Sequence, residues 1–470
     1  MTKIAIIGLG YVGLPLGLRF AESDVSVLGL DVDSSKVEAI NAGRSYIKHI
    51  EASKIAAARE SGRLEASTDF SRVAEVEAVL ICVPTPLNKY REPDMSYVLK
   101  SGAAIAPYLA ARDNDEELIA NDVKSDAGGR LSPAAATSAT PAIPSSSGLH
   151  PSSSTPTPRA KLVVLESTTY PGTTDTDLRE VLEAGSGLKA GVDFHLAFSP
   201  EREDPGRKDH SVKTIPKVMG GYTEACLERC VELYSLALDV VHPVSSCRVA
   251  EATKLTENIF RSVNIALVNE LKVVFHKMDI DVWDVIDAAA TKPFGYMPFY
   301  PGPGLGGHCI PIDPFYLTWK AREYDQHTKF IELAGEINTA MPDYVVARVG
   351  EALNEYAKSI KCSRILLLGM AYKPNVDDDR ESPSYVLMKK LENKGATVDY
   401  NDPYVPVIKE TREHSEYAGR QSVDITDDYD CILLATHHDE YKTFDFSDFK
   451  APLVDTRNCV TKRPAKYYRA

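Results

Sequence analysis

Residues 3–13 read KIAIIGLGYVG, an apolar run followed at once by the pattern G-x-G-x-x-G. An unbroken apolar run is typical of a strand that is buried on both faces of a parallel sheet. Residues 14–22 have the pattern of a helix, and residues 25–30 that of a second strand. Strand, glycines, helix and strand in this order predict the first unit of a doubly wound α/β domain that binds a dinucleotide.

Each glycine of this motif is expected to have a different structural role. Gly8 makes the tight turn, Gly10 lets a pyrophosphate approach the backbone, and Gly13 lets the helix pack closely. Asp31 ends the second strand. Its carboxylate would accept hydrogen bonds from a ribose and repel a 2′-phosphate, so we expect NAD rather than NADP. The expected cofactor contacts in the loop are Gly8, Gly10, Tyr11, Val12 and Gly13.

Length and composition bound the class of protein. The chain has 470 residues, 44% hydrophobic and 26% charged, which predicts a globular protein of two or three domains. No apolar run approaches a membrane span and no leader precedes the first strand, so we expect a cytoplasmic protein without a membrane partner. The net charge of −14 argues against a nucleic-acid partner.

The cysteine and histidine spacings do not suggest a metal. Eight cysteines are scattered without a C-x-x-C pair, which indicates reduced thiols. His437 and His438 are adjacent and cannot easily share one ion, and no third ligand is in view. We therefore predict no metal site.

Polar turns follow the next expected strands, where ligands of open α/β sheets bind. Residues 78–83 lead into PTP, which contains Thr85, and residues 162–165 lead into ESTTYPGT. Thr168 is the ligand candidate of the second turn, while Thr173 or Thr174 is expected to cap the following helix.

An acidic turn, PEREDPG, follows the strand expected at residues 194–199. Glu201 lies nearest the strand end and is its functional candidate, whereas a solvated turn is the better interpretation for Glu203 and Asp204. Between the helix at 96–110 and the strand at 162–165, residues 113–159 change composition abruptly. Residues 131–158 are almost all Ser, Pro, Ala, Thr and Gly, which predicts a disordered insertion that the fold should tolerate losing.

Residues 248–279 have the pattern of a helix long enough to link two domains or to pair with its copy in a dimer. Lys254 and Asn258 share one face of it. They are either an exposed stripe or a polar pair aimed at a substrate.

Beyond a helix at 334–358, the strand–helix pattern restarts and predicts a second doubly wound domain, with Lys373 and Arg380 in its first loop. The expected domains are 1–205, 206–330 and 331–470.

Residues 302–314 read GPGLGGHCIPIDP. Glycines and prolines before Cys309, with Asp313 four residues later, suit a nucleophile that a bulky ligand must approach. A small buried cysteine in a turn is an equally good interpretation of this stretch alone.

Together these motifs resemble the UDP-glucose/GDP-mannose dehydrogenase family over nearly the whole chain outside the insertion. The resemblance implies an enzyme that oxidises the C6 hydroxyl of a nucleotide-bound hexose to the carboxylate with two NAD. It also implies two Rossmann-like domains, a central helical dimerisation region, and a homodimer or larger homo-oligomer. The stretch GGHCIPIDPFYLTWKA, residues 306–321, is similar to members that act on UDP-N-acetylhexosamines, UDP-N-acetylglucosamine above all.

The resemblance also implies residue roles. Cys309 would add to the intermediate aldehyde as a thiohemiacetal and become a thioester, which water hydrolyses. Lys254 would stabilise the oxyanion, with Asn258 and Thr168 holding water or the reacting oxygen. Glu201 would activate water and Asp313 assist proton transfer. The implied substrate contacts are Glu201, Arg202, Lys254, Asn258, Phe299, Tyr300, Gly302, Gly306, Lys373 and Arg457, and the further cofactor contacts are Thr85, Thr168 and Arg380.

Three alternatives remain open at this point. UDP-N-acetylmannosamine or UDP-glucose are alternative substrates within the same reaction. A catalytically silent protein that binds NAD and nucleotide sugars is an alternative of another class.

Overall fold

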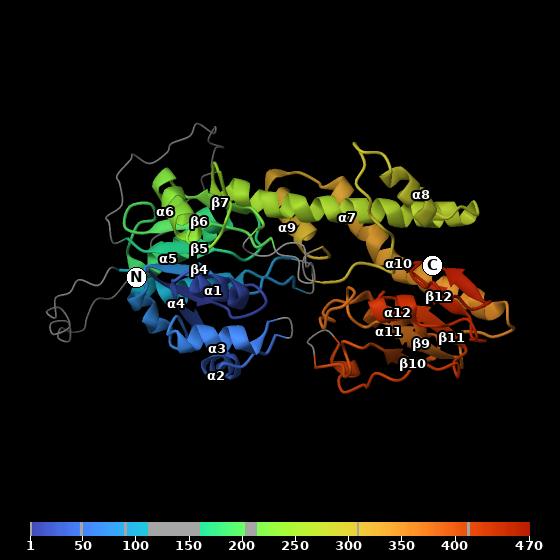
Figure 1. Cartoon of the computed structure of the whole chain (residues 1–470). Coiled ribbons are helices and arrows are strands. Elements are labelled where there is room, and N and C mark those ends of the chain that lie inside the picture. The colour runs from blue at the N-terminus through green and yellow to red at the C-terminus, as the bar shows by residue number, and fades with distance from the viewer. Residues whose placement is uncertain are drawn as a thin grey trace, which may run out of the picture.

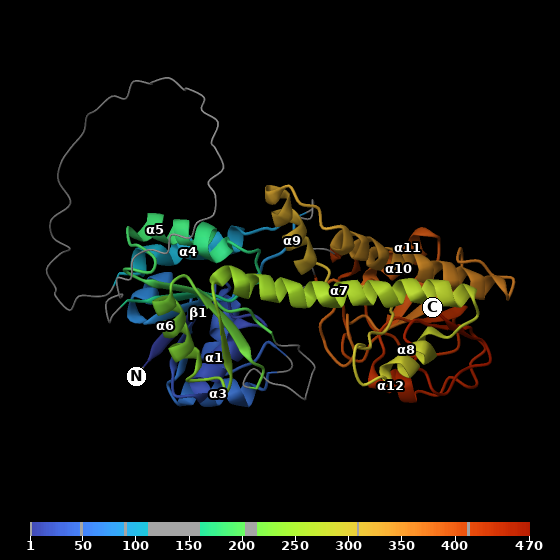
Figure 2. The ribbon, with the colours of Figure 1, turned by 90° about the horizontal axis from the view of Figure 1, so that it is seen from above.

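The computed structural model describes residues 2–47, 50–88, 92–110, 160–202, 214–307, 310–410 and 414–470. Two α/β domains lie at opposite ends of the long helix α7 (Cys247–Lys277), as the two views agree (Figure 1, Figure 2). The fold is therefore mixed α/β, with two sheet domains joined by a helical region. The predicted insertion at 113–159 lies outside the described residues.

The first domain is built on an eight-stranded sheet of order β3-β2-β1-β4-β5-β6-β7-β8. Neighbouring strands are parallel except β6 and β7, which are antiparallel. The strands are β1 (Lys3–Ile7), β2 (Ser26–Leu30), β3 (Leu64–Ser67), β4 (Ala78–Ile81), β5 (Leu162–Leu165), β6 (His195–Phe198), β7 (Lys217–Gly221) and β8 (Val241–Val244).

Both faces of this sheet are buried, as the apolar run of β1 predicts. Ile4 and Ile6 pack with side chains of α1, α2, α3 and α6, while Ala5 and Ile7 pack with those of α4, α5 and the start of α7. The helices are α1 (Gly13–Glu22), α2 (Ser34–Asn41), α3 (Ala52–Glu60), α4 (Ser96–Ile105), α5 (Arg179–Ser186) and α6 (Glu224–Tyr234), with short helical turns at Phe70–Glu75, Ala106–Tyr108 and Thr173–Leu178.

The expected domain boundary after residue 205 needs correction. Strands β7 and β8 belong to the first sheet, which continues to Val244. The sequence reading omitted these strands because neither is an unbroken apolar run: β7 reads KVMGG and β8 reads VHPV. The first domain therefore extends to the start of α7.

The predicted helix cap at Thr173 or Thr174 is also wrong. The turn Thr173–Leu178 begins after Gly172, and no side chain of the cap residue closes it. Thr173 donates instead to the Tyr170 carbonyl at 2.8 Å, and Thr174 donates to Glu251 at 2.8 Å. Glu251, from α7, accepts the backbone N–H groups of Gly172 and Thr174. The start of this turn is therefore capped by a carboxylate from a distant part of the chain and not by a local hydroxyl.

The central region consists of long helices that contact each other. Helix α7 begins at the N-cap Ser246 and packs along α10 (Lys329–Asn354). In that contact Asn269 of α7 donates to Asn338 of α10, which donates to the Ser262 carbonyl, each at 3.0 Å. The other helices are α8 (Val282–Ala290), α9 (Asp313–Ala321) and a turn at Arg322–Tyr324.

The second domain carries a five-stranded parallel sheet of order β10-β9-β11-β12-β13. Ile365 and Leu367 of β9 pack with α10 and α11, and Leu366 and Leu368 pack on the opposite face. The elements are β9 (Arg364–Leu368), α11 (Pro383–Asn393), β10 (Thr397–Asn401), β11 (Cys431–Leu434), α12 (Asp439–Thr443), β12 (Leu453–Asp455) and β13 (Tyr467–Arg469), with a turn at Ser415–Tyr417. Within the ranges described, no helix has the length and apolar character that crossing a membrane requires.

Candidate active site

The glycine loop after β1 has the shape that a pyrophosphate requires. Gly8 adopts φ of 90°, and a Cβ on Gly13 would overlap the Gly8 carbonyl oxygen. A Cβ on Gly10 would meet no atom of the described residues within 4 Å, which leaves space beside the backbone for a ligand. Helix α1 starts at Gly13 and points its N-terminus at this space. These residues fit the diphosphate of NAD.

Asp31 fixes the same loop. Its carboxylate accepts the Leu9 N–H at 2.8 Å and the Asp33 N–H at 3.0 Å, and it pairs with Lys36 at 3.2 Å. The side chain is buried where β2 ends, next to the first glycine turn. It therefore holds the loop in place, and its contact with a ribose stays a prediction.

The second domain reaches the glycine loop through Arg380. Its guanidinium carbon lies 4.5 Å from the centre of the Tyr11 ring, and its nitrogens bond Asp378 at 2.7 and 2.8 Å. Burial and the Asp378 carboxylate raise the pKa of Tyr11. Arg380 comes from the loop after β9, so the two predicted cofactor residues meet across the domains.

Thr85, the predicted cofactor residue after β4, is held from α9. Tyr316 donates to the Thr85 carbonyl at 2.7 Å. The side chain of Thr168 is partly exposed at the end of β5, beside Ser167, whose hydroxyl donates to the Val83 carbonyl at 2.7 Å. These bonds bring the two turns together at the carboxyl edge of the sheet.

Lys254, Asn258 and Asp313 form a buried group between α7 and α9. The Asn258 amide donates to the Asp313 carboxylate, and Arg261 donates to the Asn258 oxygen. Lys254 is 7% exposed and donates to the Glu201 main-chain carbonyl. The exposed-stripe interpretation of Lys254 and Asn258 is therefore wrong, because both side chains face inward.

The Asp313 carboxyl holds its proton more tightly than an exposed carboxyl does. Burial raises its pKa to about 7, although Lys254, Asn258 and Arg261 favour the charged form. A carboxyl that titrates near neutrality exchanges protons readily at physiological pH.

Glu201 is held at both its main chain and its side chain. Lys217 donates to its carboxylate at 3.2 Å and to Glu166 at 2.7 Å. The other Glu166 oxygen accepts the Tyr234 hydroxyl. Although burial alone would lower it, the charges of Glu166 and Glu201 raise the pKa of Lys217, which stays protonated.

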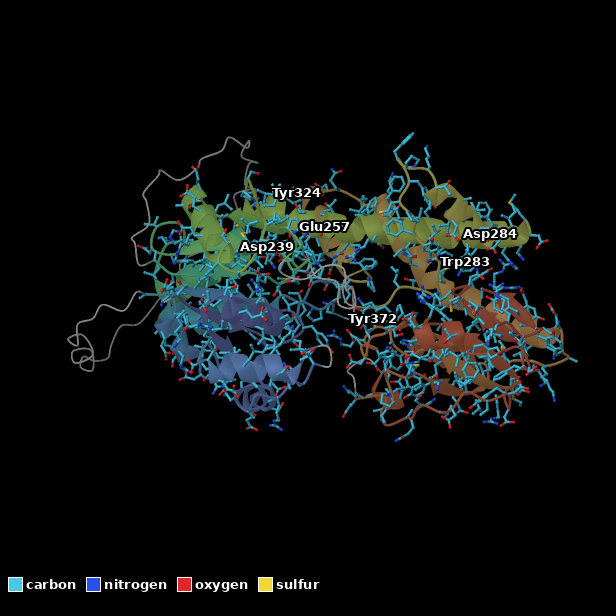
Figure 3. The ribbon with its side chains drawn as sticks, in the orientation of Figure 1. Asp239, Glu257, Trp283, Asp284, Tyr324 and Tyr372 are labelled. Atoms are coloured by element: carbon cyan, nitrogen blue, oxygen red, sulfur yellow. The ribbon has the colours of Figure 1, made fainter. Side chains whose placement is uncertain are left out.

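Arg202, a predicted substrate contact, is engaged elsewhere. Its guanidinium pairs with Glu257 of α7 at 2.6 Å and donates to the Pro216 carbonyl at 2.6 Å. Figure 3 shows Glu257 on α7. In this structure Arg202 ties the acidic turn to that helix.

The loop from Phe299 to Gly306 lies between α8 and the second domain. The Phe299 ring packs on Phe260 at 5.7 Å, and the exposed Tyr300 donates to Asp287 of α8 at 2.7 Å. A Cβ on Gly306 would lie 2.8 Å from Tyr372, in the first loop of the second domain. Figure 3 labels Tyr372 in the region between the two sheet domains.

Lys373 follows Tyr372, and its ammonium lies 5.5 Å from that ring. Cys309 and His308 lie outside the described residues. Gly307, directly before them, adopts φ of 78° and packs against Tyr372, while Asp313 starts α9 shortly after them. The described ends of this segment therefore lie next to Asp313 on one side and the Lys373 loop on the other.

Sequence reasoning missed several residues that support the site, namely Lys217, Glu166, Glu251 and Lys272. Each has an ionisable side chain that is almost fully buried, Lys217 and Glu166 at the ends of strands and Glu251 and Lys272 in helix α7. A charged residue inside a buried-strand or buried-helix pattern was the available signal.

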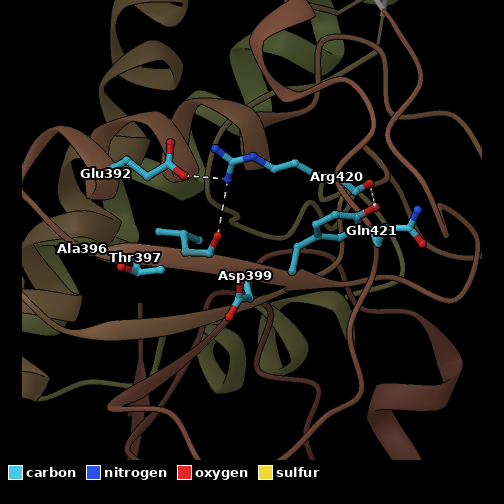
Figure 4. Close-up of a pocket in the computed structure, with 8 residues that line it drawn as sticks. Glu392, Ala396, Thr397, Asp399, Arg420 and Gln421 are labelled. Carbon is cyan, nitrogen blue, oxygen red and sulfur yellow. Dashed lines mark hydrogen bonds and ion pairs between the residues drawn. The ribbon is translucent and has the colours of Figure 1, made fainter.

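A pocket in the second domain lies away from these residues. It sits between the end of α11 and the start of β10, with Arg420 donating to Glu392 at 2.7 Å across it (Figure 4). Since β10 runs parallel to β9, this is the edge opposite to the loop that carries Lys373 and Arg380. We assign it no part in the site.

Three sequence models of one family match the chain in order. They describe the NAD binding domain (residues 2–121 and 154–238), the central domain (248–340) and the UDP binding domain (366–462) of the UDP-glucose/GDP-mannose dehydrogenase family. The chain belongs to this family. It is an NAD-dependent UDP-sugar dehydrogenase, an oxidoreductase whose cofactor is NAD.

Individual members of the family are similar along most of their length. The UDP-N-acetyl-D-glucosamine 6-dehydrogenase of Pseudomonas aeruginosa is 32% identical, over 94% of this chain and 91% of that protein. The UDP-N-acetyl-D-mannosamine dehydrogenase of Pyrococcus horikoshii is 30% identical, over 99% and 97%. A solved structure of UDP-D-ManNAc dehydrogenase from Pyrococcus horikoshii superposes with a TM-score of 0.81 at 28% identity, over 100% of this chain and 99% of that chain.

Proposed function

We propose that the protein oxidises the C6 hydroxyl of a UDP-N-acetylhexosamine, preferably UDP-N-acetylglucosamine, to the uronate in two steps. The observation that carries the proposal is the buried group of Lys254, Asn258 and Asp313 beside Glu201, directly after the segment that contains Cys309. It provides a cation, an amide and a carboxyl with a pKa of about 7 at the place where the reacting carbon would lie.

The first oxidation needs a base for the hydroxyl proton. The glycine loop would hold NAD as the hydride acceptor, and two NAD molecules in succession would each supply one two-electron oxidation per turnover. Asp313, with its pKa of about 7, takes the hydroxyl proton directly or through a water held by Asn258. Lys254 stabilises the negative charge on the reacting oxygen.

The second oxidation needs a nucleophile, because a free aldehyde is a poor hydride donor. The Cys309 thiolate adds to the aldehyde carbon, and Asp313 returns the proton to the resulting oxygen. Loss of a second hydride and of this proton gives a thioester. Glu201 orients a water that attacks the thioester carbon, which releases the carboxylate and regenerates the thiolate.

Both domains would supply substrate contacts. Lys373 and Arg380 come from the loop after β9, and Arg457 follows β12, so all three lie at the carboxyl edge of the second sheet. This edge faces the loop from Phe299 to Gly306, which we propose holds the uridine diphosphate.

The active form is proposed to be a homodimer. Helix α7 exposes Phe260, Leu267 and Val274, which are spaced by seven residues along one face. An exposed apolar stripe on a long helix favours pairing with another surface. Light scattering should give the mass of a dimer or a larger oligomer, and a stable monomer with full activity would contradict this part.

The reaction is tested by replacing the nucleophile. Cys309→Ser should retain NAD binding by titration calorimetry while conversion of UDP-N-acetylglucosamine to the uronate falls below detection. Full activity in this variant would overturn the mechanism. Because similar proteins include a UDP-N-acetyl-D-mannosamine dehydrogenase, the wild type is compared on UDP-N-acetylglucosamine, UDP-N-acetylmannosamine and UDP-glucose.

A further inference from the structure

Helix α7 binds the loop from Phe299 to Gly306 at Gly302. Asn269 accepts the Gly302 N–H at 3.0 Å, and Lys272 donates to the Gly302 carbonyl at 3.1 Å. Lys272 is 3% exposed, and its ammonium lies 5.1 Å from the Tyr344 ring of α10. Both polar groups of one loop residue are therefore held from the same helix.

A second cation converges on the same glycine. The Arg457 guanidinium occupies the position that a Cβ on Gly302 would take, and its Nε donates to the Ala435 carbonyl at 2.9 Å. Lys272 and Arg457 come from different domains, so the positive charges meet where the loop joins α7 to the second sheet.

Among the residues that the structure describes, no carboxylate raises the pKa of Lys272, and Asp455 offsets the effect of burial on Arg457 only in part. Burial and the charge of Arg457 lower the pKa of Lys272 to about 7, and no resolved acid opposes them. Burial also lowers the pKa of Arg457 to about 10. The nearby carboxylate of Asp455 accepts the N–H groups of Arg457, Cys459 and Val460 at 2.8 to 3.1 Å.

The remaining polar neighbours do not supply negative charge either. Burial and the charge of Arg457 lower the pKa of His437 to about 3, and its Nδ1 has no hydrogen-bond partner within the part of the chain that the structure describes. Tyr344 faces Lys272 from α10 as a neutral ring, since burial raises its pKa. A buried amine without a counter-ion is stable in its neutral form, and it is stable in its protonated form only when an anion binds beside it.

We propose that the diphosphate of the bound nucleotide sugar completes the Lys272–Arg457 pair, and that Lys272 takes up a proton when this substrate binds. The proposal rests on the proposed function and adds to it a substrate-linked residue. A diphosphate diester keeps its two negative charges throughout the neutral range, so the proton comes from solvent and is bound by the amine. An opposite charge within about 6 Å typically shifts a pKa by one unit or more toward the charged form.

The sign of the pH dependence follows. Below about pH 7 Lys272 is already protonated in the free protein, so few protons are taken up when the substrate binds. Above this pH the free amine is neutral, and binding must recruit a proton. The dissociation constant should therefore rise with pH above about 7, by up to tenfold per pH unit.

The test measures UDP-N-acetylglucosamine binding without NAD, in titration calorimetry at about pH 6 and about pH 8. Buffers of different ionisation enthalpy, such as HEPES and Tris, give the number of protons taken up. Wild type should take up about half a proton or more at the higher pH and almost none at the lower. Lys272→Met should take up none and bind more weakly, while the exposed Lys277→Met on the same helix should behave as wild type.

A second variant keeps the test decisive if Lys272→Met does not fold. Lys272→Arg carries a permanent charge, so it should bind the substrate with an affinity that no longer falls with pH and without proton uptake. Binding by wild type without proton uptake, or uptake unchanged in either variant, would overturn this inference alone. Absence of binding to any of the three UDP-sugars would overturn the proposed function with it.

Discussion

The chemistry of Asp313 depends on its surroundings. It starts α9, is fully buried, and accepts a hydrogen bond from Asn258 while Lys254 lies near. In an exposed position the same carboxyl would be ionised throughout the neutral range and would be a weak base. Burial moves its titration to about pH 7, where it can accept and return protons.

Replacing Asp313 by Asn should separate catalysis from stability. We expect kcat to fall by about 100-fold or more, because Asn cannot transfer the proton, and the rise of activity through pH 7 to disappear. Steady-state NADH formation across pH checks this, with Asp284→Asn on the exposed face of α8 as the control.

The stability of the same variant has a defined sign. A raised pKa in the folded state favours the neutral carboxyl, so its contribution is present at acid pH and is lost as pH rises through about 7. Asp313→Asn removes that loss, so its thermal midpoint at pH above 7 should equal or exceed that of wild type. A lower midpoint would indicate that the carboxylate is needed for folding.

Lys217 is a buried lysine that forms ion pairs with two carboxylates. Its exposure is 4%, and removing it leaves Glu166 and Glu201 without their cation. Lys217→Met should therefore lower the free energy of unfolding by about 3 kcal/mol in urea denaturation.

The matched control is Lys390→Met, which breaks the more exposed Lys390–Asp343 pair of 2.6 Å. Exposed pairs contribute little, so this variant should unfold as wild type does. Equal effects of the two substitutions would show that burial does not strengthen the Lys217 interactions.

Among the elements, the glycine loop before α1 makes two different demands. Gly13 is needed by the protein itself, since a Cβ would overlap the Gly8 carbonyl, whereas the space at Gly10 is open for the cofactor. Gly10→Ala should keep the wild-type thermal midpoint and weaken NAD binding at least about tenfold. Gly13→Ala should lower the thermal midpoint as well, and the reverse pattern would contradict these roles.

The elements that the sequence predicted correctly are those whose structure depends on residues close to them in the chain. The glycine loop, the shared face of Lys254 and Asn258, and strands β5, β11 and β12 follow from local pattern. Helix α7 was predicted within two residues at either end.

Other parts depend on contacts between distant residues. Asn258 meets Asp313 across 55 positions of sequence, and Lys217 meets Glu166 across 51. Strands β7 and β8 were missed because neither is an unbroken apolar run. Glu251 of α7, rather than a local hydroxyl, accepts the Thr174 N–H. No local pattern reports such partners.

For the whole molecule, the arrangement of domains is what assembles the site. Arg380 of the second domain stacks on Tyr11 of the first, and Arg457 of the second meets Gly302 of the central region. Helix α7 carries Lys254 near the first sheet and Lys272 near the second, so one rigid element sets the distance between the two sets of residues.

The predicted insertion is not expected to take part in this assembly. It would connect the turn Ala106–Tyr108 to β5, which pairs with β4 in the same sheet. Excising residues 115–158 and joining the ends with a short Gly/Ser linker should leave soluble yield and NADH production as in wild type. Loss of either would contradict the prediction.

The central claim is a four-electron oxidation of a UDP-N-acetylhexosamine, and stoichiometry tests it most directly. NADH and remaining sugar nucleotide are measured together with UDP-N-acetylglucosamine, UDP-N-acetylmannosamine and UDP-glucose under the same conditions. We predict two NADH for each UDP-N-acetylglucosamine consumed, with the uronate as product and slower turnover of the other two. One NADH per sugar with a free aldehyde as product, or no NADH from any of the three, would contradict the account.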